Sequence, residues 1–374
     1  MSDEAEGEPP SEGIRGPSGH GTFDSDADAA RGPLDPEGAW ERAAKEGIHR
    51  LRIPTPFAVG RVNTYLIEDE PLTLIDSGPN SAKALDELET QLAALGRSIE
   101  EIELLVLTHQ HLDHTGLAKI IARRSGAEVA AIDILAPHLA SYSSDAEAED
   151  EFAAELMRRH GIADDVVTAL RSVSSNFRAW GSAVEVTRRL RDGERLELGE
   201  RELTVQLRPG HSPSDTLFWD ERRGILVGGD HLLAQISSNP LLSRPLDGTD
   251  SEAGTRRSAL LSYIDSMRLT RELDAGIILP GHGEPITDHV GLIDSRMAMH
   301  ERRAKKLLRL LNDYGPMNAH QIARRLWGDV AISQAFLTLS EVIGHLDVLA
   351  QRELVREVDG EPVHFEAVGA RAGR

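Results

Sequence analysis

Three histidines and one aspartate lie close together in the segment Thr108–Gly116, and these side chains could together bind metal ions. The short apolar run before them predicts a buried strand. Because side chains alternate along an extended chain, His109 and His111 are expected to point to the same side. Asp113 and His114 then turn toward a second nearby point. Nitrogen and oxygen donors in this arrangement suit two divalent ions a few ångströms apart.

Three further candidate ligands follow at intervals, and each lies in a loop directly after a short apolar run. Glycine or proline stands beside each of them, which permits sharp turns and close approach of the backbone to an ion. These residues are His211, Asp230 and His282. His231 directly follows Asp230 and is expected to be a supporting or structural residue.

The elements that must position these side chains alternate between strand and helix from residue 48 to residue 285, which predicts an α/β fold. Val62–Ile67 and Leu72–Asp76 have the pattern of a β-hairpin. Ala82–Leu95 has helical apolar spacing and is followed by a glycine suited to cap it.

The ordered series of candidate residues resembles the motifs of the metallo-β-lactamase superfamily over roughly residues 48–288. The series is Asp76, His109-x-His111-x-Asp113-His114, His211, Asp230 and His282. The resemblance implies the αββα sandwich of that superfamily and a metal-dependent hydrolase activity. It also implies two divalent metal ions. Donors without thiolate suit Zn²⁺, with Mn²⁺ or Fe²⁺ as alternatives.

The resemblance also implies a role for each of these residues. Asp230 would bridge both ions, whereas Asp76 would orient the metal-binding loop without binding metal. Asp113 would in addition steer the nucleophile or carry a proton as a catalytic residue. The other ligands form two sets, which are His109, His111 and His211 for one ion and Asp113, His114 and His282 for the other.

The expected nucleophile is a metal-bridging hydroxide. Ser212 next to His211 offers a serine–histidine alternative, but adjacency in sequence is not triad geometry. Other histidines lack a comparable setting and are expected to be ordinary core or surface residues: His20, His49, His138, His160 and His300.

Composition narrows the functions further. The sequence has no cysteine, which excludes disulfides and thiolate ligands. The absence also separates the chain from superfamily members with a cysteine where Asp230 stands, many zinc β-lactamases among them. It favours the branches that act on thioesters, lactones or phosphodiesters. The net charge of −21 opposes long-range attraction of nucleic acid.

The expected domain organisation begins with a disordered acidic tail over residues 1–40, which are poor in large apolar groups. Residues 41–292 form the catalytic domain. A helical, lid-like insert over residues 137–184 would interrupt it, with Phe177 and Trp180 lining an apolar substrate pocket. The alternative is that these two aromatic side chains only pack the insert onto the core.

The remaining residues, 293–374, are expected to form a separate domain of three helices, over Met297–Tyr314, Asn318–Leu326 and Ile332–Leu349, followed by a hairpin. Asp359-Gly360 is typical of a type I′ turn in that hairpin. The pattern resembles the winged-helix domain of the β-lactamase-like hydrolases and endoribonucleases. The third helix has no Lys or Arg side chain that could contact a DNA phosphate, so DNA binding is not expected. Packing, substrate covering or homo-oligomer formation is expected instead.

The sequence is compatible with three functions. The first is a dinuclear hydrolase of a small carbonyl substrate, which would be a thioester, an ester or a lactone. The second is a metal-dependent endoribonuclease, with RNA as a less favoured partner. The third is a non-catalytic metal-binding regulator. No sequence segment has the length of a membrane span, and the acidic N-terminus lacks a secretory pattern, so a cytoplasmic location and no membrane partner are expected.

Overall fold

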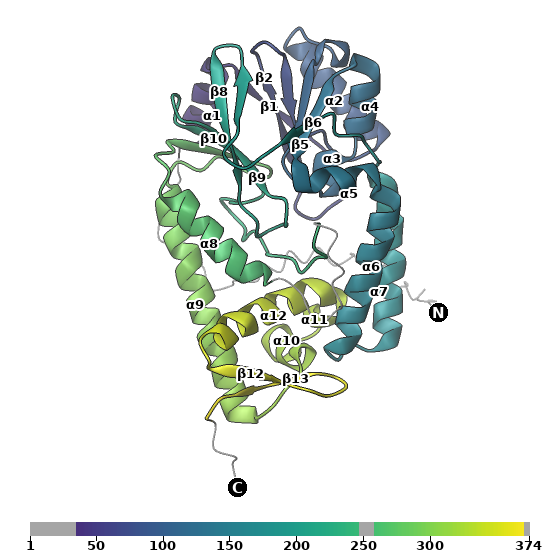
Figure 1. Cartoon of the computed structure of the whole chain (residues 1–374), viewed down its shortest axis with the longest axis vertical. Coiled ribbons are helices and arrows are strands. Elements are labelled where there is room, and N and C mark those ends of the chain that lie inside the picture. The colour runs from purple at the N-terminus through teal and green to yellow at the C-terminus, as the bar shows by residue number, and fades with distance from the viewer. Residues whose placement is uncertain (1–34, 247–257, 370–374) are drawn as a thin grey trace, which may run out of the picture. The chain divides into compact units, whose positions relative to one another are not determined.

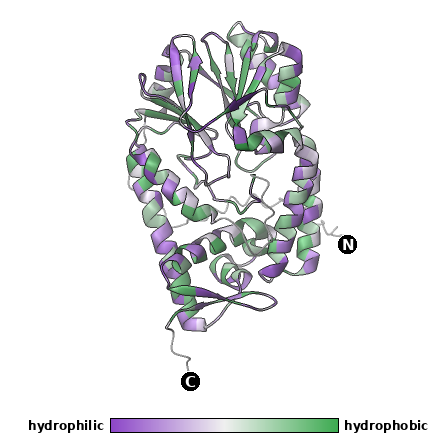
Figure 2. Cartoon of the chain, in the orientation of Figure 1, coloured by the Kyte–Doolittle hydropathy of each residue, from purple (hydrophilic) through white to green (hydrophobic). Residues whose placement is uncertain are grey.

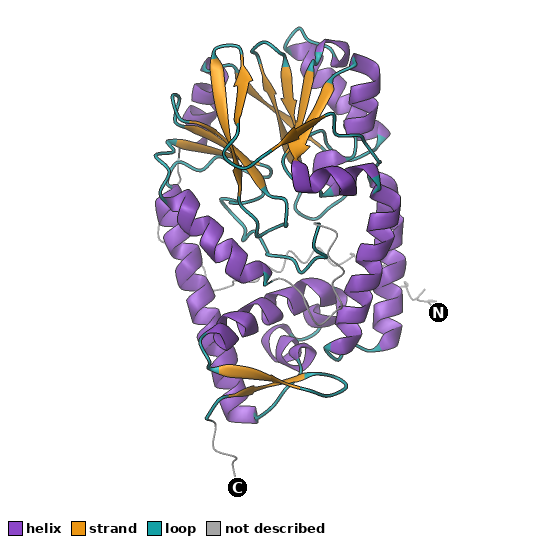
Figure 3. Ribbon diagram, in the orientation of Figure 1, coloured by secondary structure: helices purple, strands orange, loops and turns teal. Residues whose placement is uncertain are grey.

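A computed structural model describes residues 35–246 and 258–369 (Figure 1). Two β-sheets dominate its N-terminal part (Figure 3). The first has the strand order β1-β2-β3-β4-β5-β6, and the second β11-β10-β9-β8-β7. Their strands are β1 Ile48–Ile53, β2 Val62–Ile67, β3 Thr73–Ile75, β4 Leu104–Leu107, β5 Glu128–Ile132, β6 Arg188–Leu190, β7 Arg195–Leu198, β8 Arg201–Leu207, β9 Thr216–Asp220, β10 Ile225–Gly229 and β11 Ile277–Pro280.

The first sheet combines two kinds of pairing. Strands β1, β2 and β3 pair antiparallel, which confirms the predicted hairpin of β2 and β3. Strands β3, β4, β5 and β6 pair parallel. All four residues of β4 are buried, as a continuous apolar run predicts for a parallel strand covered on both faces. The carboxyl ends of β4 and β5 therefore lie at one edge of the sheet.

The second sheet is buried on both faces. Phe218 in β9 packs into the apolar core shared with the first sheet. Its neighbours Leu217 and Trp219 face a separate cluster that contains residues of helix α8 (Ala259–Arg271). Since successive side chains of a strand point to opposite faces, α8 covers the outer face of this sheet. Helices α2 and α4 cover the first sheet (Figure 1), which gives the predicted αββα layers.

The helices of the described residues alternate hydrophilic and hydrophobic positions (Figure 2). Within residues 35–246 and 258–369, none has the length and apolar composition needed to cross a bilayer. The α-helices are α1 Pro36–Lys45, α2 Ala82–Ala94, α3 Leu112–Thr115, α4 Ala118–Ser125, α5 Ala136–Ala140, α6 Tyr142–Arg159, α7 Asp164–Phe177, α8 Ala259–Arg271, α9 His289–Tyr314, α10 Ala319–Trp327, α11 Val330–Ser333 and α12 Ala335–Gln351, with 3₁₀ turns η1 Ile99–Glu101, η2 Asp133–Leu135 and η3 Arg178–Trp180.

The boundary predicted for the disordered tail is wrong at its end, because helix α1 begins at Pro36. The Asp35 side chain accepts a hydrogen bond from the Gly38 amide and caps the helix. Ala39 and Ala43 are buried against the sheet core, and this burial stabilises the short helix. The rest of the predicted tail lies outside the described residues.

The insert and the C-terminal helices share one apolar core. Leu156 and Met157 of α6 belong to the same buried cluster as Leu307 of α9 and Leu339 of α12. Helix α9 also runs without a break across the domain boundary predicted at residues 292 and 293. The insert is thus packed on the C-terminal helical region through a substantial hydrophobic contact.

The C-terminal region contains the predicted helices and hairpin, with two differences. The third predicted helix is divided into α11 and α12. Strands β12 (Val355–Val358) and β13 (His364–Ala367) pair with Val358 opposite His364. Five residues therefore connect the strands, and the predicted two-residue type I′ turn is wrong. The connection contains Pro362, which has no N–H group to continue the ladder.

Candidate metal centre

Four loops bring the candidate ligands together, and each begins where a buried strand ends. The loop after β4 carries the histidine cluster, and His111 is the N-cap of α3. The other three follow β8, β10 and β11 and carry His211, Asp230 and His282, respectively. The strands thereby place side chains that are far apart in sequence at one end of the two sheets.

The first set of side chains converges around His111. The His111 Nδ1 atom lies 3.0 Å from His109 Nε2 and 2.9 Å from His211 Nε2. His109 is buried, and the other two are partly buried. Three imidazole nitrogens at these separations can surround one ion.

The second set consists of Asp113, His114 and His282, all buried, with candidate ligand atoms within 4.8 Å of one another. The His282 Nε2 atom lies 3.2 Å from Asp113 Oδ2. The rings of His109 and His114 are 4.1 Å apart between centroids, so the two sets adjoin.

Asp230 lies between the two sets. Its Oδ1 atom is 3.6 Å from His114 Nε2, and its Oδ2 atom is 3.6 Å from His211 Nε2 and 3.5 Å from His282 Nε2. Oδ2 thus lies between His211 of the first set and His282 of the second, and Oδ1 lies near His114 of the second set, so the carboxylate can reach an ion held by either set.

The Asp76 carboxylate holds the histidine-containing loop after β4 through three hydrogen bonds. It accepts them from the Thr108 amide at 2.9 Å, the Thr108 hydroxyl at 2.8 Å and His114 Nδ1 at 2.7 Å. The Thr108 hydroxyl in turn lies 2.9 Å from His109 Nδ1. Asp76 has a φ of 60°, a left-handed conformation that aspartate tolerates better than most residues. These contacts leave Nε2 of both histidines facing the site.

Two other histidines are oriented by backbone carbonyls. His282 Nδ1 lies 2.9 Å from the Arg61 carbonyl oxygen, and His211 Nδ1 lies 3.3 Å from that of Asn239. Sequence reasoning missed these partners and Thr108. Arg61 and Asn239 act through main-chain atoms, so their residue types carried no signal.

Burial and neighbouring charges decide which side chains of the site are neutral and which are charged. Burial, together with the nearby His114, holds the pKa of His109 well below its usual value, and burial beside His211 lowers the pKa of His111 to about 3. Burial opposes ionisation of Asp230, but His282 and His114 hold its pKa well below the usual range. His109 and His111 are thus neutral and Asp230 is ionised, as metal ligands require. Burial also opposes protonation of His114 and His282, but Asp230 raises the pKa of both, that of His114 well above its usual value, and a bound cation would displace these protons.

Two buried atoms indicate that the site fits metal ions. Among the described residues, His114 Nε2 and Asp230 Oδ1 have no hydrogen-bond partner although both are buried. Leaving such atoms unpaired costs about 1–3 kcal/mol each, which coordination to a cation would offset. A Cβ at Gly281 would overlap Asp230 Oδ1, so only glycine leaves room at this position. Nitrogen and oxygen donors without sulfur suit Zn²⁺, Mn²⁺ or Fe²⁺.

The remaining predicted residues lie around this centre in different ways. The Ser212 hydroxyl accepts a hydrogen bond from the Ser214 amide at 3.2 Å and lies 3.3 Å from the Ser214 hydroxyl, which gives no support to a serine–histidine pair. The Phe177 ring lies 5.5 Å from the Phe57 ring, which belongs to the loop between β1 and β2. Trp180 belongs to η3, which packs against α3 and hence beside the histidine cluster.

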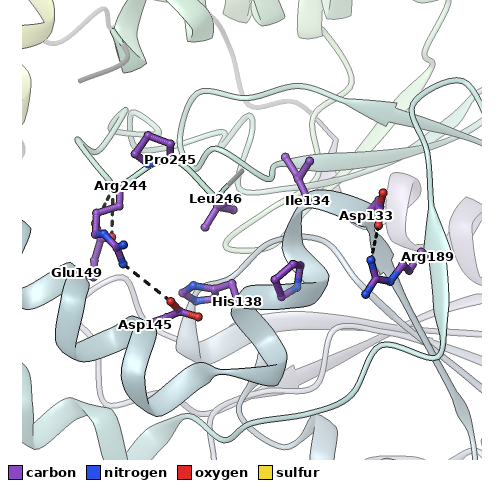
Figure 4. Close-up of a pocket in the computed structure, with 10 residues that line it drawn as sticks. Asp133, Ile134, His138, Asp145, Glu149, Arg189, Arg244, Pro245 and Leu246 are labelled. Atoms are coloured by element: carbon purple, nitrogen blue, oxygen red, sulfur yellow. Dashed lines mark hydrogen bonds and ion pairs between the residues drawn. The ribbon is translucent and has the colours of Figure 1, made fainter. Parts of the chain in front are cut away.

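A cavity of about 340 Å³ opens near the same sheet edge (Figure 4). It begins directly after β5, whose carboxyl end lies beside that of β4. His138 and Asp145 line it from the insert, and Arg244 lines it from the segment that follows Asp230. Burial raises the pKa of Glu149, also in the lining, to about 7. The cavity is polar and contains neither Phe177 nor Trp180 in its lining.

Comparisons with known proteins agree with this geometry. Residues 58–282 match the model of the metallo-β-lactamase superfamily. A probable metallo-hydrolase of Bacillus subtilis is 36% identical over 324 residues, covering 86% of this chain and 98% of that protein. A crystal structure of a metallo-β-lactamase family protein from Thermus thermophilus has a TM-score of 0.70 at 27% identity, covering 86% and 98% of the two chains. A human acyl-coenzyme A thioesterase is 30% identical over 189 residues, which is 46% of this chain and 58% of that protein.

Proposed function

The chain belongs to the metallo-β-lactamase superfamily as a metal-dependent hydrolase, and we propose that it uses two divalent metal ions to hydrolyse a small carbonyl substrate, with an acyl thioester as the first candidate. The observation that carries the proposal is the position of Asp230 between two complete sets of nitrogen and oxygen donors. An endoribonuclease is less favoured, because the net charge of −21 opposes approach of RNA.

Seven residues would hold the metal ions. When bound, two such ions would lower the pKa of a coordinated water from about 15.7 toward 7 and so supply a hydroxide nucleophile at neutral pH. The chain contributes the orientation of the ligands, since the partners behind His109, His114, His211 and His282 fix the nitrogen that each presents. The seven are His109, His111, Asp113, His114, His211, Asp230 and His282.

Asp113 is the proposed proton carrier. Burial opposes its ionisation, but the neighbouring His114 and the hydrogen bond from His282 lower its pKa below the usual value. The carboxylate is therefore ionised at neutral pH. Its Oδ2 atom faces His282 Nε2, and its second oxygen can accept a proton from the attacking water and return it to the leaving group.

Substrate class is inferred from three features. Asp230 stands where many zinc β-lactamases have cysteine, which favours the branches that act on thioesters, lactones or phosphodiesters. The aromatic pair of Phe57 and Phe177 offers an apolar surface for an acyl chain, and Trp180 beside α3 extends it. The human relative that acts on acyl-coenzyme A supports a thioester in particular.

The proposal is tested by adding acyl-coenzyme A esters, lactones and labelled RNA to the full chain loaded with Zn²⁺ or with Mn²⁺. We expect turnover of thioesters in the wild type, with a loss of at least about 100-fold in Asp113→Ala, since the change removes both a ligand and a proton carrier. Asp294→Ala is a matched control, because Asp294 is a half-exposed carboxylate of α9 that pairs with Arg271 and lies outside both ligand sets.

The outcomes separate the candidate functions. Lactone turnover alone would keep the carbonyl hydrolase and change the substrate. RNA cleavage that is lost in Asp113→Ala would replace the proposal with an endoribonuclease. Metal binding without turnover of any of these substrates would favour the regulator.

A further inference from the structure

Tyr263 of helix α8 contacts two of the three loops that carry candidate ligands of the second sheet, those after β8 and β10. Its hydroxyl donates a hydrogen bond of 2.7 Å to the carbonyl oxygen of His231, the residue after Asp230. Its side chain lies against Gly210, the residue before His211, where an added Cβ would be 2.7 Å from the tyrosine Cβ. The tyrosine is 1% exposed, so neither contact is exchanged with water.

Two neighbouring hydroxyls of α8 hold the same loops. The Ser266 hydroxyl donates to the Pro209 carbonyl oxygen at 2.7 Å, just before the loop residue His211. The Thr270 hydroxyl lies 2.9 Å from His231 Nε2. One face of α8 therefore holds the loops after β8 and β10, by main-chain contacts in both and by the His231 side chain in the second.

The C-terminal helices hold α8 in this position. Leu260 of α8 lies so close to Gly344 of α12 that a Cβ there would be 2.9 Å away. Val348 of α12 belongs to the apolar cluster around Tyr263. The Tyr263 ring also contacts the His300 ring of α9, edge to face, with centroids 6.3 Å apart.

The segment that follows Asp230 is tied to the same helices. The Leu242 amide donates to the Ser340 hydroxyl of α12 at 3.3 Å, and the Arg296 guanidinium of α9 donates to the Ile236 carbonyl oxygen at 3.0 Å. Between these two anchors lies Asn239, whose carbonyl oxygen orients His211. The C-terminal helices are thus connected to the candidate ligands in two ways, through contacts with α8 and through contacts with the segment that follows Asp230.

We propose that Tyr263 is a positioning residue of the metal centre, which transmits the support of helices α9 and α12 to the ligands His211 and Asp230. The inference rests on the proposed function, in which these two residues bind metal. Burial raises the pKa of Tyr263, so its hydroxyl stays protonated and remains a donor to the His231 carbonyl. The hydroxyl acts on the main chain and touches no reacting atom.

The test compares Tyr263→Phe with Tyr142→Phe in the full chain. Tyr142 is a matched control, because it is also buried, its hydroxyl donates to the Arg178 carbonyl oxygen at 2.9 Å, and its ring also lies against a glycine, Gly181. The readout is the Zn²⁺ affinity of metal-free protein, measured by competition with a chelator, beside the thermal unfolding midpoint of the same metal-free samples.

We expect Zn²⁺ affinity in Tyr263→Phe to fall about 10-fold or more, the size found when a group supporting a ligand is lost, and to stay at the wild-type value in Tyr142→Phe. Equal loss of unfolding midpoint in both variants with unchanged Zn²⁺ affinity would overturn the inference and leave Tyr263 a packing residue. If circular dichroism shows that Tyr263→Phe does not fold, Ser266→Ala decides by the same readout, since it frees the Pro209 carbonyl. Wild-type protein that binds no Zn²⁺ would instead overturn the proposed function.

Discussion

Two buried histidine clusters in this molecule look alike in composition and differ in what surrounds them. The first is the metal centre. The second lies between α9 and α12 and consists of His300, Glu341 and His345, with candidate ligand atoms within 4.8 Å of one another. Proximity of histidine and carboxylate is therefore common to both, and the difference must come from their other partners.

In the second cluster a protein cation already neutralises the carboxylate. The Arg303 guanidinium binds the Glu341 carboxylate. His345 Nδ1 lies 2.7 Å from the Glu341 carbonyl oxygen, and its Nε2 lies 3.1 Å from His300 Nδ1, so that one ring nitrogen can donate and the next accept. Burial and the nearby His345 lower the pKa of His300 to about 3, which keeps that ring neutral. This cluster joins two helices around an ion pair. Within the described part of the chain, His300 Nε2 is buried without a hydrogen-bond partner, as two atoms of the metal centre are, so the arginine bound to Glu341 is what distinguishes the second cluster.

The largest expected effect is at the residue between the two ligand sets. Asp230→Ala should abolish binding of both ions and reduce turnover by more than about 100-fold, because it removes the carboxylate that lies between the two sets. Isothermal titration with Zn²⁺ and initial rates with an acyl thioester measure the two effects. Retention of tight binding at both sites would show that Asp230 does not bridge them.

In the second cluster we expect that removing the Glu341 charge lowers the stability of the fold without changing the number of bound metal ions. Burial opposes ionisation of Glu341, but His345 and Arg303 lower its pKa from 4.5 to about 2. A lowered carboxyl pKa contributes stability that is present above the unfolded pKa and lost as pH falls from about 4.5 to about 2. The shift corresponds to about 3 kcal/mol at pH 7.

Glu341→Gln should therefore lower the free energy of unfolding by about 3 kcal/mol at pH 7, as measured with urea. The difference from wild type should shrink below pH 4.5. A constant difference down to pH 3 would refute the ion pair as its cause. Bound Zn²⁺ per chain at pH 7 should not change.

The support behind the histidine loop should have an intermediate effect. Asp76→Asn keeps the shape and tolerates the positive φ, but it loses the negative charge that accepts from His114 Nδ1. Zn²⁺ affinity should fall by about 10–100-fold, as measured by chelator competition. Unchanged affinity would mean that Thr108 and the backbone orient the loop without this carboxylate.

The smallest expected effect separates the clusters most sharply. His300→Asn should leave the number of bound Zn²⁺ ions at the wild-type value, because Arg303 already supplies the positive charge that Glu341 needs. Elemental analysis of the loaded protein measures this number. Loss of one ion in this variant alone would mean that the second cluster binds metal.

The candidate ligands could be identified in the sequence because the pattern that marks them is local. The spacing from His109 to His114 and the glycines beside His211 and His282 identify loops after buried strands, and such loops meet at one end of an αββα fold. Long periodic elements were also predictable, as α2 shows by ending within a residue of its expected end.

The supporting contacts could not be predicted, because they join residues distant in sequence through main-chain atoms. Nothing in the sequence around Tyr263 indicates that its hydroxyl meets the His231 carbonyl. The shared core of α6 and α12 was hidden for the same reason, since each helix shows only an apolar face and not its partner. The insert was therefore expected to act as a lid, and a homo-oligomer through the C-terminal region stays a prediction.

We propose that two sets of side chains hold one metal ion each. Native mass spectrometry of the Zn²⁺-loaded full chain tests it directly, with His111→Ala and His282→Ala beside the wild type and His49→Ala, which changes a histidine paired with Glu68 at the surface, as the control. The account predicts two ions per chain in the wild type and the control, and one in each of the other variants. A single ion in the wild type, or two ions retained in both ligand variants, would contradict it.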